Sequence, residues 1–149
     1  KIDEGRSAPL AQFLRFAEIP GVRLIAMQKN HGLDQLKDVP DHINIQQLGD
    51  DFDSGKDAFL DTLGVLANLD LMVTTDTSVV HVAGGFGARV FVALKDHPDW
   101  RWMFDRDDSP WYPTARLFRQ TEFAVWDDVF IRMTEAVREL VATHGRRKD

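Results

Sequence analysis

Apolar and polar residues follow two alternating periods along this chain. Short continuous apolar runs predict buried strands at residues 22–27, 71–75 and 90–94, and weaker ones at 43–48 and 115–118. Apolar residues three or four apart predict helices at residues 10–17, 56–69, 79–86 and 126–143, with one or two turns at 33–39. Strands and helices in this alternation predict an α/β fold, a doubly wound parallel sheet covered by helices on both faces.

Small polar residues and glycine mark the ends of these elements. Ser7 lies three residues before the first helical run and is its expected N-cap. Asp76, Thr77 and Ser78 join a strand directly to a helix, which Gly87 then closes. In a doubly wound sheet, ligands bind beyond the carboxyl ends of the strands, so we expect the site at the loops 28–32, 48–51, 76–78 and 95–102.

Length and composition predict one soluble domain spanning residues 1–149, without an internal repeat or linker. No apolar run approaches the ~20 residues that span a bilayer. The sequence has no Cys, which removes disulfides and thiolate chemistry and agrees with an expected cytoplasmic location. Because it opens on Lys1 and carries no signal peptide, we expect it to be a fragment of a longer chain.

Charge argues against a nucleic-acid partner. The formal net charge is −6, from 24 acidic and 18 basic residues, so a broad basic surface is not expected. The basic cluster at residues 146–148 follows the last helical run and predicts a solvated terminus.

Residues 75–85 carry the strongest chemical signal. A helix that begins directly after a strand presents free backbone N–H groups, which suit a phosphate or diphosphate. The hydroxyls of Thr77 and Ser78 add donors, while a structural interpretation gives Asp76, Thr77 and Ser78 a capping role alone. His81 lies one turn further and faces either the ligand loop or the core.

Other candidate groups are less specific. Lys29 ends a predicted strand, where its ammonium can neutralise a diphosphate or simply lie on the surface. The chain has no Gly-Lys-Ser/Thr P-loop. The dinucleotide fingerprint is also missing, and the glycine-rich residues 84–87 end a helix instead of opening one. The spacing of the five His residues fits no metal motif, so no metal is predicted.

Residues 99–113 contain three of the four Trp residues among many charges. Aromatic rings stack on bases and sugars, and they also hold long loops against a domain by burial. Burial is the favoured prediction for most of them. Asp107 and Asp108 are adjacent and are expected to solvate the loop, not to form an acid/base pair.

Several motifs together resemble a known family. They are LIAMQK at residues 24–29, DT at 61–62, LDLMVTTDTSVVHVAG at 69–84, DWRW at 99–102, SPWYP at 109–113 and RLFRQ at 116–120. In this order they resemble the C-terminal domain of bacterial tetratricopeptide-repeat proteins related to the heptosyltransferases (glycosyltransferase family 9) and, more distantly, to O-linked GlcNAc transferases.

This resemblance implies the C-terminal, Rossmann-like half of a GT-B glycosyltransferase. A nucleotide diphosphate sugar would be its donor, without a metal or further cofactor. Asp76, Thr77, Ser78 and His81 would hold the donor diphosphate, and Lys29 would approach it. Family members have a strand ahead of the motif seen here as RSAPL at residues 6–10, so the resemblance implies that the fold lacks its first strand. The catalytic base and the acceptor site would lie outside this chain.

Two alternatives stay open at this point. A catalytically inert α/β module attached to tetratricopeptide repeats would bind a nucleotide or a protein partner. A phosphatase using Asp76 is disfavoured, because Thr74 occupies the place of the second Asp in a D-x-D motif. If a central strand is missing, the strands on either side of it have unpaired edges. These edges can pair with a second copy of the chain, which predicts a homodimer.

Overall fold

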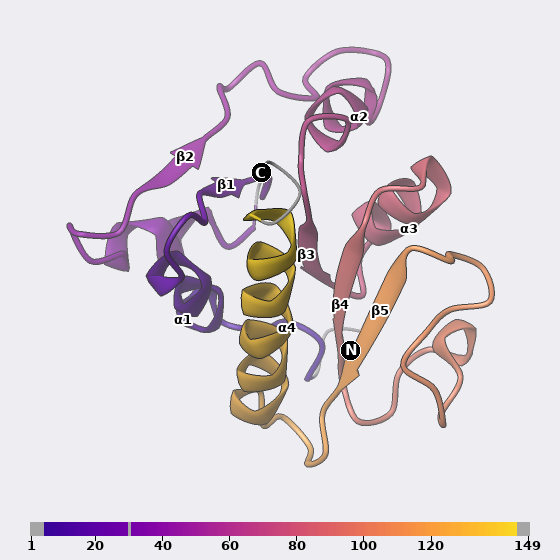
Figure 1. The fold of residues 1–149 in the computed structure, drawn as a ribbon. Coiled ribbons are helices and arrows are strands. Elements are labelled where there is room, and N and C mark those ends of the chain that lie inside the picture. The colour runs from indigo at the N-terminus through magenta and orange to yellow at the C-terminus, as the bar shows by residue number, and fades with distance from the viewer. Residues whose placement is uncertain (1–4, 30, 146–149) are drawn as a thin grey trace.

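A computed structural model describes residues 5–29 and 31–145 (Figure 1). It has an α/β fold with parallel sheets and alternating strand and helix units, Rossmann-like as predicted. Asn30 of the predicted loop 28–32 and the basic tail at residues 146–148 lie outside the described residues.

All the predicted strands are present. They are β1 (Leu24–Ala26), β2 (Ile45–Gln47), β3 (Met72–Thr75), β4 (Val90–Leu94) and β5 (Ala115–Arg119). Within the described ranges these strands form two sheets, β1-β2 and β3-β4-β5, and every pair is parallel. The chain therefore winds outward in two directions, as in a doubly wound fold.

Two of the four predicted helices, those at residues 10–17 and 56–69, are shorter than predicted, and the other two match within two residues at each end. The helices are α1 (Leu10–Phe13), α2 (Leu60–Leu66), α3 (Ser78–Phe86) and α4 (Asp127–Gly145), with 3-10 helices η1 (Leu14–Glu18), η2 (Leu33–Asp38) and η3 (Trp100–Trp102). Two expectations were wrong. Pro9, not Ser7, occupies the N-cap of α1, and α2 begins only at Leu60 because Phe59 has a left-handed backbone, with φ of 66°.

Strand β4 lies at the centre of the three-stranded sheet. Val90 aligns with Met72 of β3 and with Ala115 of β5, so β4 is paired on both edges. All of its residues are buried. Phe91 and Ala93 face one core cluster, whereas the alternate residues face the other.

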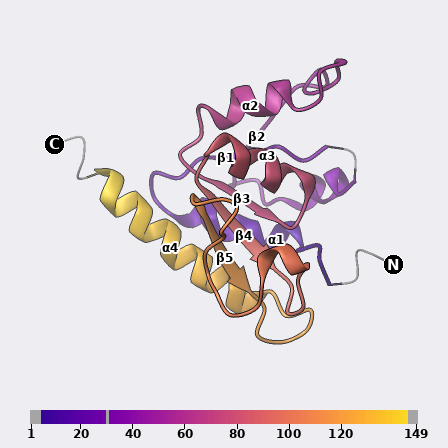
Figure 2. The same ribbon diagram turned by 90° about the vertical axis from the view of Figure 1, so that its right-hand side faces the viewer.

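The two clusters lie on opposite faces of this sheet. Helix α4 covers one face (Figures 1 and 2), where Phe130, Met133 and Val137 are buried in the same core cluster as Phe91 and Ala93 of β4. On the other face, Val80 and Ala83 of α3 pack against β4. Helix α3 therefore rests on a buried sheet, and its first turn follows the carboxyl end of β3.

Candidate functional site

The start of α3 is open to solvent. Thr77 has an extended backbone, with φ of −134° and ψ of 170°, and its carbonyl accepts the Val80 N–H at 3.1 Å. In the described part of the chain, no side chain caps this helix. Thr77 and Ser78 are exposed. The first backbone N–H groups of α3 are thus left for solvent or an anion.

Two threonine hydroxyls lie close to each other just before α3. The buried Thr74 places its hydroxyl 3.4 Å from the hydroxyl of Thr77. Asp76, which lies between these two threonines in the sequence, is half-buried. Four of the five predicted site residues therefore lie together after the carboxyl end of β3, namely Asp76, Thr77, Ser78 and His81.

His81 faces the Trp-rich segment. Its ring stacks on Trp102, with centroids 5.6 Å apart and planes 13° apart, and its Nδ1 lies 2.9 Å from the Tyr112 hydroxyl. Its side chain is half-buried. His81 thus connects α3 to residues 99–113.

Tyr112 packs directly on α3 at Gly84. A Cβ atom added at Gly84 would lie 2.4 Å from the Tyr112 Cγ, closer than real Cβ contacts come. Gly84 itself is buried. A glycine at this point of the helix is what admits the aromatic ring, so Gly84, Tyr112 and His81 form one packed unit.

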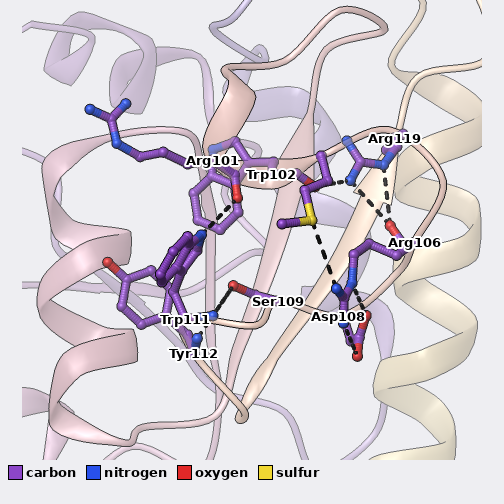
Figure 3. Close-up of polar contacts among 9 residues, drawn as sticks. Arg101, Trp102, Arg106, Asp108, Ser109, Trp111, Tyr112 and Arg119 are labelled. Atoms are coloured by element: carbon purple, nitrogen blue, oxygen red, sulfur yellow. Dashed lines mark hydrogen bonds and ion pairs between the residues drawn. The ribbon is translucent and has the colours of Figure 1, made fainter.

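Polar contacts hold the Trp-rich segment in this position (Figure 3). The Ser109 hydroxyl accepts the backbone N–H groups of Trp111, at 3.2 Å, and Tyr112, at 3.3 Å. The Trp111 indole N–H donates to the Arg101 carbonyl at 3.2 Å. The bond from Trp111 to Arg101 joins the beginning of the segment to its end, and Ser109 holds the turn at Trp111 and Tyr112.

Arg119 ties the same segment to β5. Its guanidinium donates to the carbonyls of Trp102 and Arg106, the latter at 3.1 Å from Nη2 (Figure 3). Burial lowers the pKa of Arg119 below its ordinary value. A half-buried cation that binds backbone oxygens fixes the loop more firmly than a surface residue would.

The prediction of burial for most Trp residues of this segment was wrong. Trp102 is 1% exposed, but Trp100 is 68% and Trp111 is 55% exposed. The Arg101 guanidinium lies 5.1 Å from the Trp100 ring centroid, so polar contacts support these two rings at the surface. Trp100 also lines a surface hollow of about 630 Å³ with five other residues, namely Met103, Phe104, Asp105, Arg106 and Asp108.

Of the two adjacent carboxylates, that of Asp108 is bound by an arginine. Asp108 forms an ion pair with Arg106, with Nε and Oδ1 2.5 Å apart, whereas the Asp107 carbonyl accepts the Leu117 N–H at 2.7 Å. Both side chains are exposed, as the sequence predicted. Arg106 lowers the pKa of Asp108 and Asp108 raises that of Arg106, mainly through their hydrogen bond.

Lys29 lies apart from the other predicted site residues. It follows β1, in the smaller sheet, and its ammonium donates to the Phe52 carbonyl in the loop after β2. Its side chain is exposed. In the described structure, Lys29 holds two loops together at the carboxyl end of β1-β2, and reaching a ligand at α3 would require that bond to open.

Within the described residues, no group of three His, Asp or Glu side chains is arranged to hold a metal ion. No described helix is long and apolar enough to cross a membrane.

Sequence reasoning missed Gly84, Trp102 and Tyr112 as parts of the site. The available signal was the glycine pair 84–85 inside a predicted helix, because a glycine there often marks close packing. The partner of that glycine could not be identified, since Tyr112 is 28 residues away in sequence.

Comparisons with known proteins give a limited result. Part of this chain is similar to protein FlbA of Caulobacter vibrioides, with 26% identity over 83 residues. The match covers 56% of this chain and 14% of FlbA. No protein-family model and no solved structure matches the chain. At this identity and coverage, the match assigns no family.

Proposed function

We propose that this chain is the nucleotide-sugar-binding half of a metal-independent GT-B glycosyltransferase. The donor diphosphate would bind at the start of α3. The single observation that carries the proposal is the uncapped, solvent-open first turn of α3, which follows the carboxyl end of a parallel strand.

The chemistry of this turn suits a diphosphate leaving group. Backbone N–H groups and the helix dipole attract negative charge, and the exposed hydroxyls of Thr77 and Ser78 add neutral donors. Donors that are already oriented stabilise the charge that develops on a departing diphosphate without reorganising. Asp76 would orient these hydroxyls, and Lys29 would supply a cation after leaving the Phe52 carbonyl.

The Trp-rich segment supports the same proposal. The Tyr112 hydroxyl holds one nitrogen of His81, which fixes the imidazole beside the first turn of α3. Ring stacking on Trp102 restricts it further. A positioned imidazole binds a phosphate oxygen at a smaller entropic cost than a mobile one. The base that activates the acceptor would come from outside this chain.

The second candidate function is a catalytically inert α/β module that binds a nucleotide or a protein partner beside tetratricopeptide repeats. The observation that favours a protein partner is the exposed group Trp100, Phe104 and Trp111. Exposed aromatic side chains are enriched at protein interfaces. Such a partner would contact this group and leave the start of α3 free.

Isothermal titration with UDP, GDP, ADP and their sugar conjugates tests the proposal. We expect saturable binding of one base, weakened at least tenfold by Thr77→Val and by His81→Ala. The matched control is Thr143→Val, because that hydroxyl lies on α4 and bonds the Leu140 carbonyl. Affinity unchanged by Thr77→Val would reject a diphosphate site at α3, whatever nucleotide binds.

A further inference from the structure

Two exposed aromatic side chains border a surface hollow in the Trp-rich segment. Its volume of about 630 Å³ falls within the range of roughly 300–1,000 Å³ that is typical of small-molecule sites. Trp100 is 68% and Phe104 is 61% exposed. Large exposed apolar side chains around one hollow indicate a binding site. Three apolar and three charged side chains line it, namely Trp100, Met103, Phe104, Asp105, Arg106 and Asp108.

The backbone that carries these rings is held by buried contacts. Trp102 is 1% exposed, and the Arg119 guanidinium donates to the carbonyls of Trp102 and Arg106 (Figure 3). Between the buried Trp102 and the exposed Phe104, Met103 has φ of 54° and ψ of −174°, which is strained for a residue other than glycine. The rings are therefore exposed on a fixed backbone, and a ligand would not have to order this segment first.

The charges at the hollow are partly balanced within the segment. Arg106 binds Asp108 through two bonds, from Nε to Oδ1 at 2.5 Å and from Nη2 to Oδ2 at 2.9 Å. Further N–H groups of the guanidinium and further lone pairs of the carboxylate stay available. Asp105 adds an exposed carboxylate that forms no ion pair among the described residues. The hollow therefore offers donors and acceptors with a small excess of negative charge.

These charges disfavour a charged ligand. An anion would meet the carboxylates of Asp105 and Asp108. A cation would meet the Arg106 guanidinium, and the Arg101 guanidinium already lies 5.1 Å from the Trp100 ring centroid. A neutral hydroxyl group suits both members of the ion pair, because it donates to a carboxylate and accepts from a guanidinium. The polar part of the hollow thus matches a neutral ligand with several hydroxyls.

The aromatic part of the hollow narrows this ligand to a sugar ring. The C–H groups of a pyranose form an apolar face that packs on an aromatic ring, while the hydroxyls at its edge remain free for polar partners. Trp100 and Phe104 supply such rings beside the charged groups. The core of a protein interface is depleted of charged residues, whereas half of the residues that line this hollow are charged. The lining therefore favours a saccharide over a protein partner.

We propose that this hollow is a second binding site, which takes a neutral hexopyranose unit of a saccharide. Trp100 and Phe104 would contact the apolar face of the sugar. The hydroxyls of the sugar would bind Asp105, Arg106 and Asp108. No residue assigned to the donor diphosphate lines this hollow, so the site goes beyond the proposed function.

An NMR titration of the 149-residue chain with methyl hexopyranosides tests this proposal without a nucleotide. The probes are the α and β methyl glycosides of glucose, galactose, mannose and N-acetylglucosamine. Sorbitol is the control, because it carries the hydroxyls of a hexose without the face of a ring. We expect at least one glycoside to bind with millimolar affinity and to shift the Trp100 indole N–H signal and the amide signals of residues 103–106. Sorbitol should leave these signals unchanged.

A matched pair of phenylalanine substitutions locates the binding. Phe104→Ala removes a ring that is 61% exposed and lines the hollow, whereas Phe123→Ala removes a ring that is 60% exposed and does not line it. Phe104→Ala should weaken binding of the glycoside by about fivefold or more, because one ring contact is lost. Phe123→Ala should leave the affinity unchanged. Both rings are exposed, so circular dichroism should show that both variants fold like the wild type.

Three results would overturn the proposal. They are no shift with any glycoside, an equal shift with sorbitol, and unchanged affinity in Phe104→Ala. Shifts centred on Thr77 and Ser78 would also overturn it, because they would place the sugar at the start of α3. Nucleotide binding at α3 is measured separately, so the failure of one site leaves the other standing.

Discussion

The two sheets differ sharply in burial. Every residue of β4 is buried, whereas no residue of β1 or β2 is, although β1 is equally apolar. Strand β4 has a neighbour on each edge and a helix layer on each face, and β1 has a single strand neighbour in the described structure. A strand is therefore buried along its whole length where both edges are paired and both faces are covered, as in β4. The candidate site at α3 rests on the better-protected sheet.

A matched pair of leucine substitutions measures this difference. Leu94 of β4 is 1% exposed, so Leu94→Ala is expected to lower the free energy of unfolding by about 2–5 kcal/mol. Leu24 of β1 is only half-buried, and Leu24→Ala should cost roughly 1 kcal/mol. Urea denaturation followed by circular dichroism checks both. Equal losses would mean that β1 is as well packed as β4.

Two adjacent glycines give opposite predictions. Gly84→Ala forces a Cβ against the Tyr112 ring and should destabilise the protein by about 1–3 kcal/mol. An alanine at Gly85 meets nothing within 4 Å, so Gly85→Ala should stabilise α3 by about 0.4–1 kcal/mol. Thermal unfolding shows the signs directly. If both substitutions change the stability in the same direction and by the same amount, Tyr112 does not pack closely on α3 at Gly84.

Arg119→Met should loosen the Trp-rich segment with a smaller global effect. The substitution keeps an apolar stem but removes the bonds to the Trp102 and Arg106 carbonyls, at a cost of roughly 1–2 kcal/mol. Limited proteolysis should then cut residues 99–111 faster than in the wild type. Arg138→Met, on the exposed side of α4, is the control. Unchanged cleavage would show that Arg119 does not restrain the segment.

The smallest expected effect is that of Asp99. The Arg101 backbone N–H donates to its carboxylate at 3.1 Å and holds the pKa of Asp99 below its ordinary value. A lowered pKa in the folded state stabilises η3 above the ordinary carboxyl pKa, and that contribution disappears as pH falls through the lowered pKa. The small stability difference between wild type and Asp99→Asn should therefore shrink below about pH 4. A difference that grows with acidity would contradict this assignment.

Local patterns predicted most of the fold. The continuous apolar run at residues 90–94 gave a buried strand with the expected boundaries, and Gly87 ends α3 in a left-handed conformation. The failures have local causes as well. Phe59 fits the apolar face of a helix in sequence, but its backbone is left-handed and its side chain is exposed. Periodicity carries no information on such a turn.

The candidate site was predicted less completely. A strand and the helix after it suffice to bring four of the site residues together, because these residues all lie within residues 76–81. They are Asp76, Thr77, Ser78 and His81. Contacts between distant segments could not be inferred from one sequence. Examples are the stacking of His81 on Trp102 and the bond from Lys29 to Phe52. Exposure of Trp100 and Trp111 was missed because burial is the commoner role of Trp in long loops.

A chemical-shift titration of the 149-residue chain with UDP, GDP and ADP tests the proposed diphosphate site at α3. A diphosphate at the start of α3 should shift the amide signals of Thr77, Ser78, Val79 and Val80 first and by the largest amounts, with one preferred base. A diphosphate site at α3 is ruled out if none of the three nucleotides shifts these amides, or if the shifts centre on the hollow beside Trp100 and leave α3 unchanged.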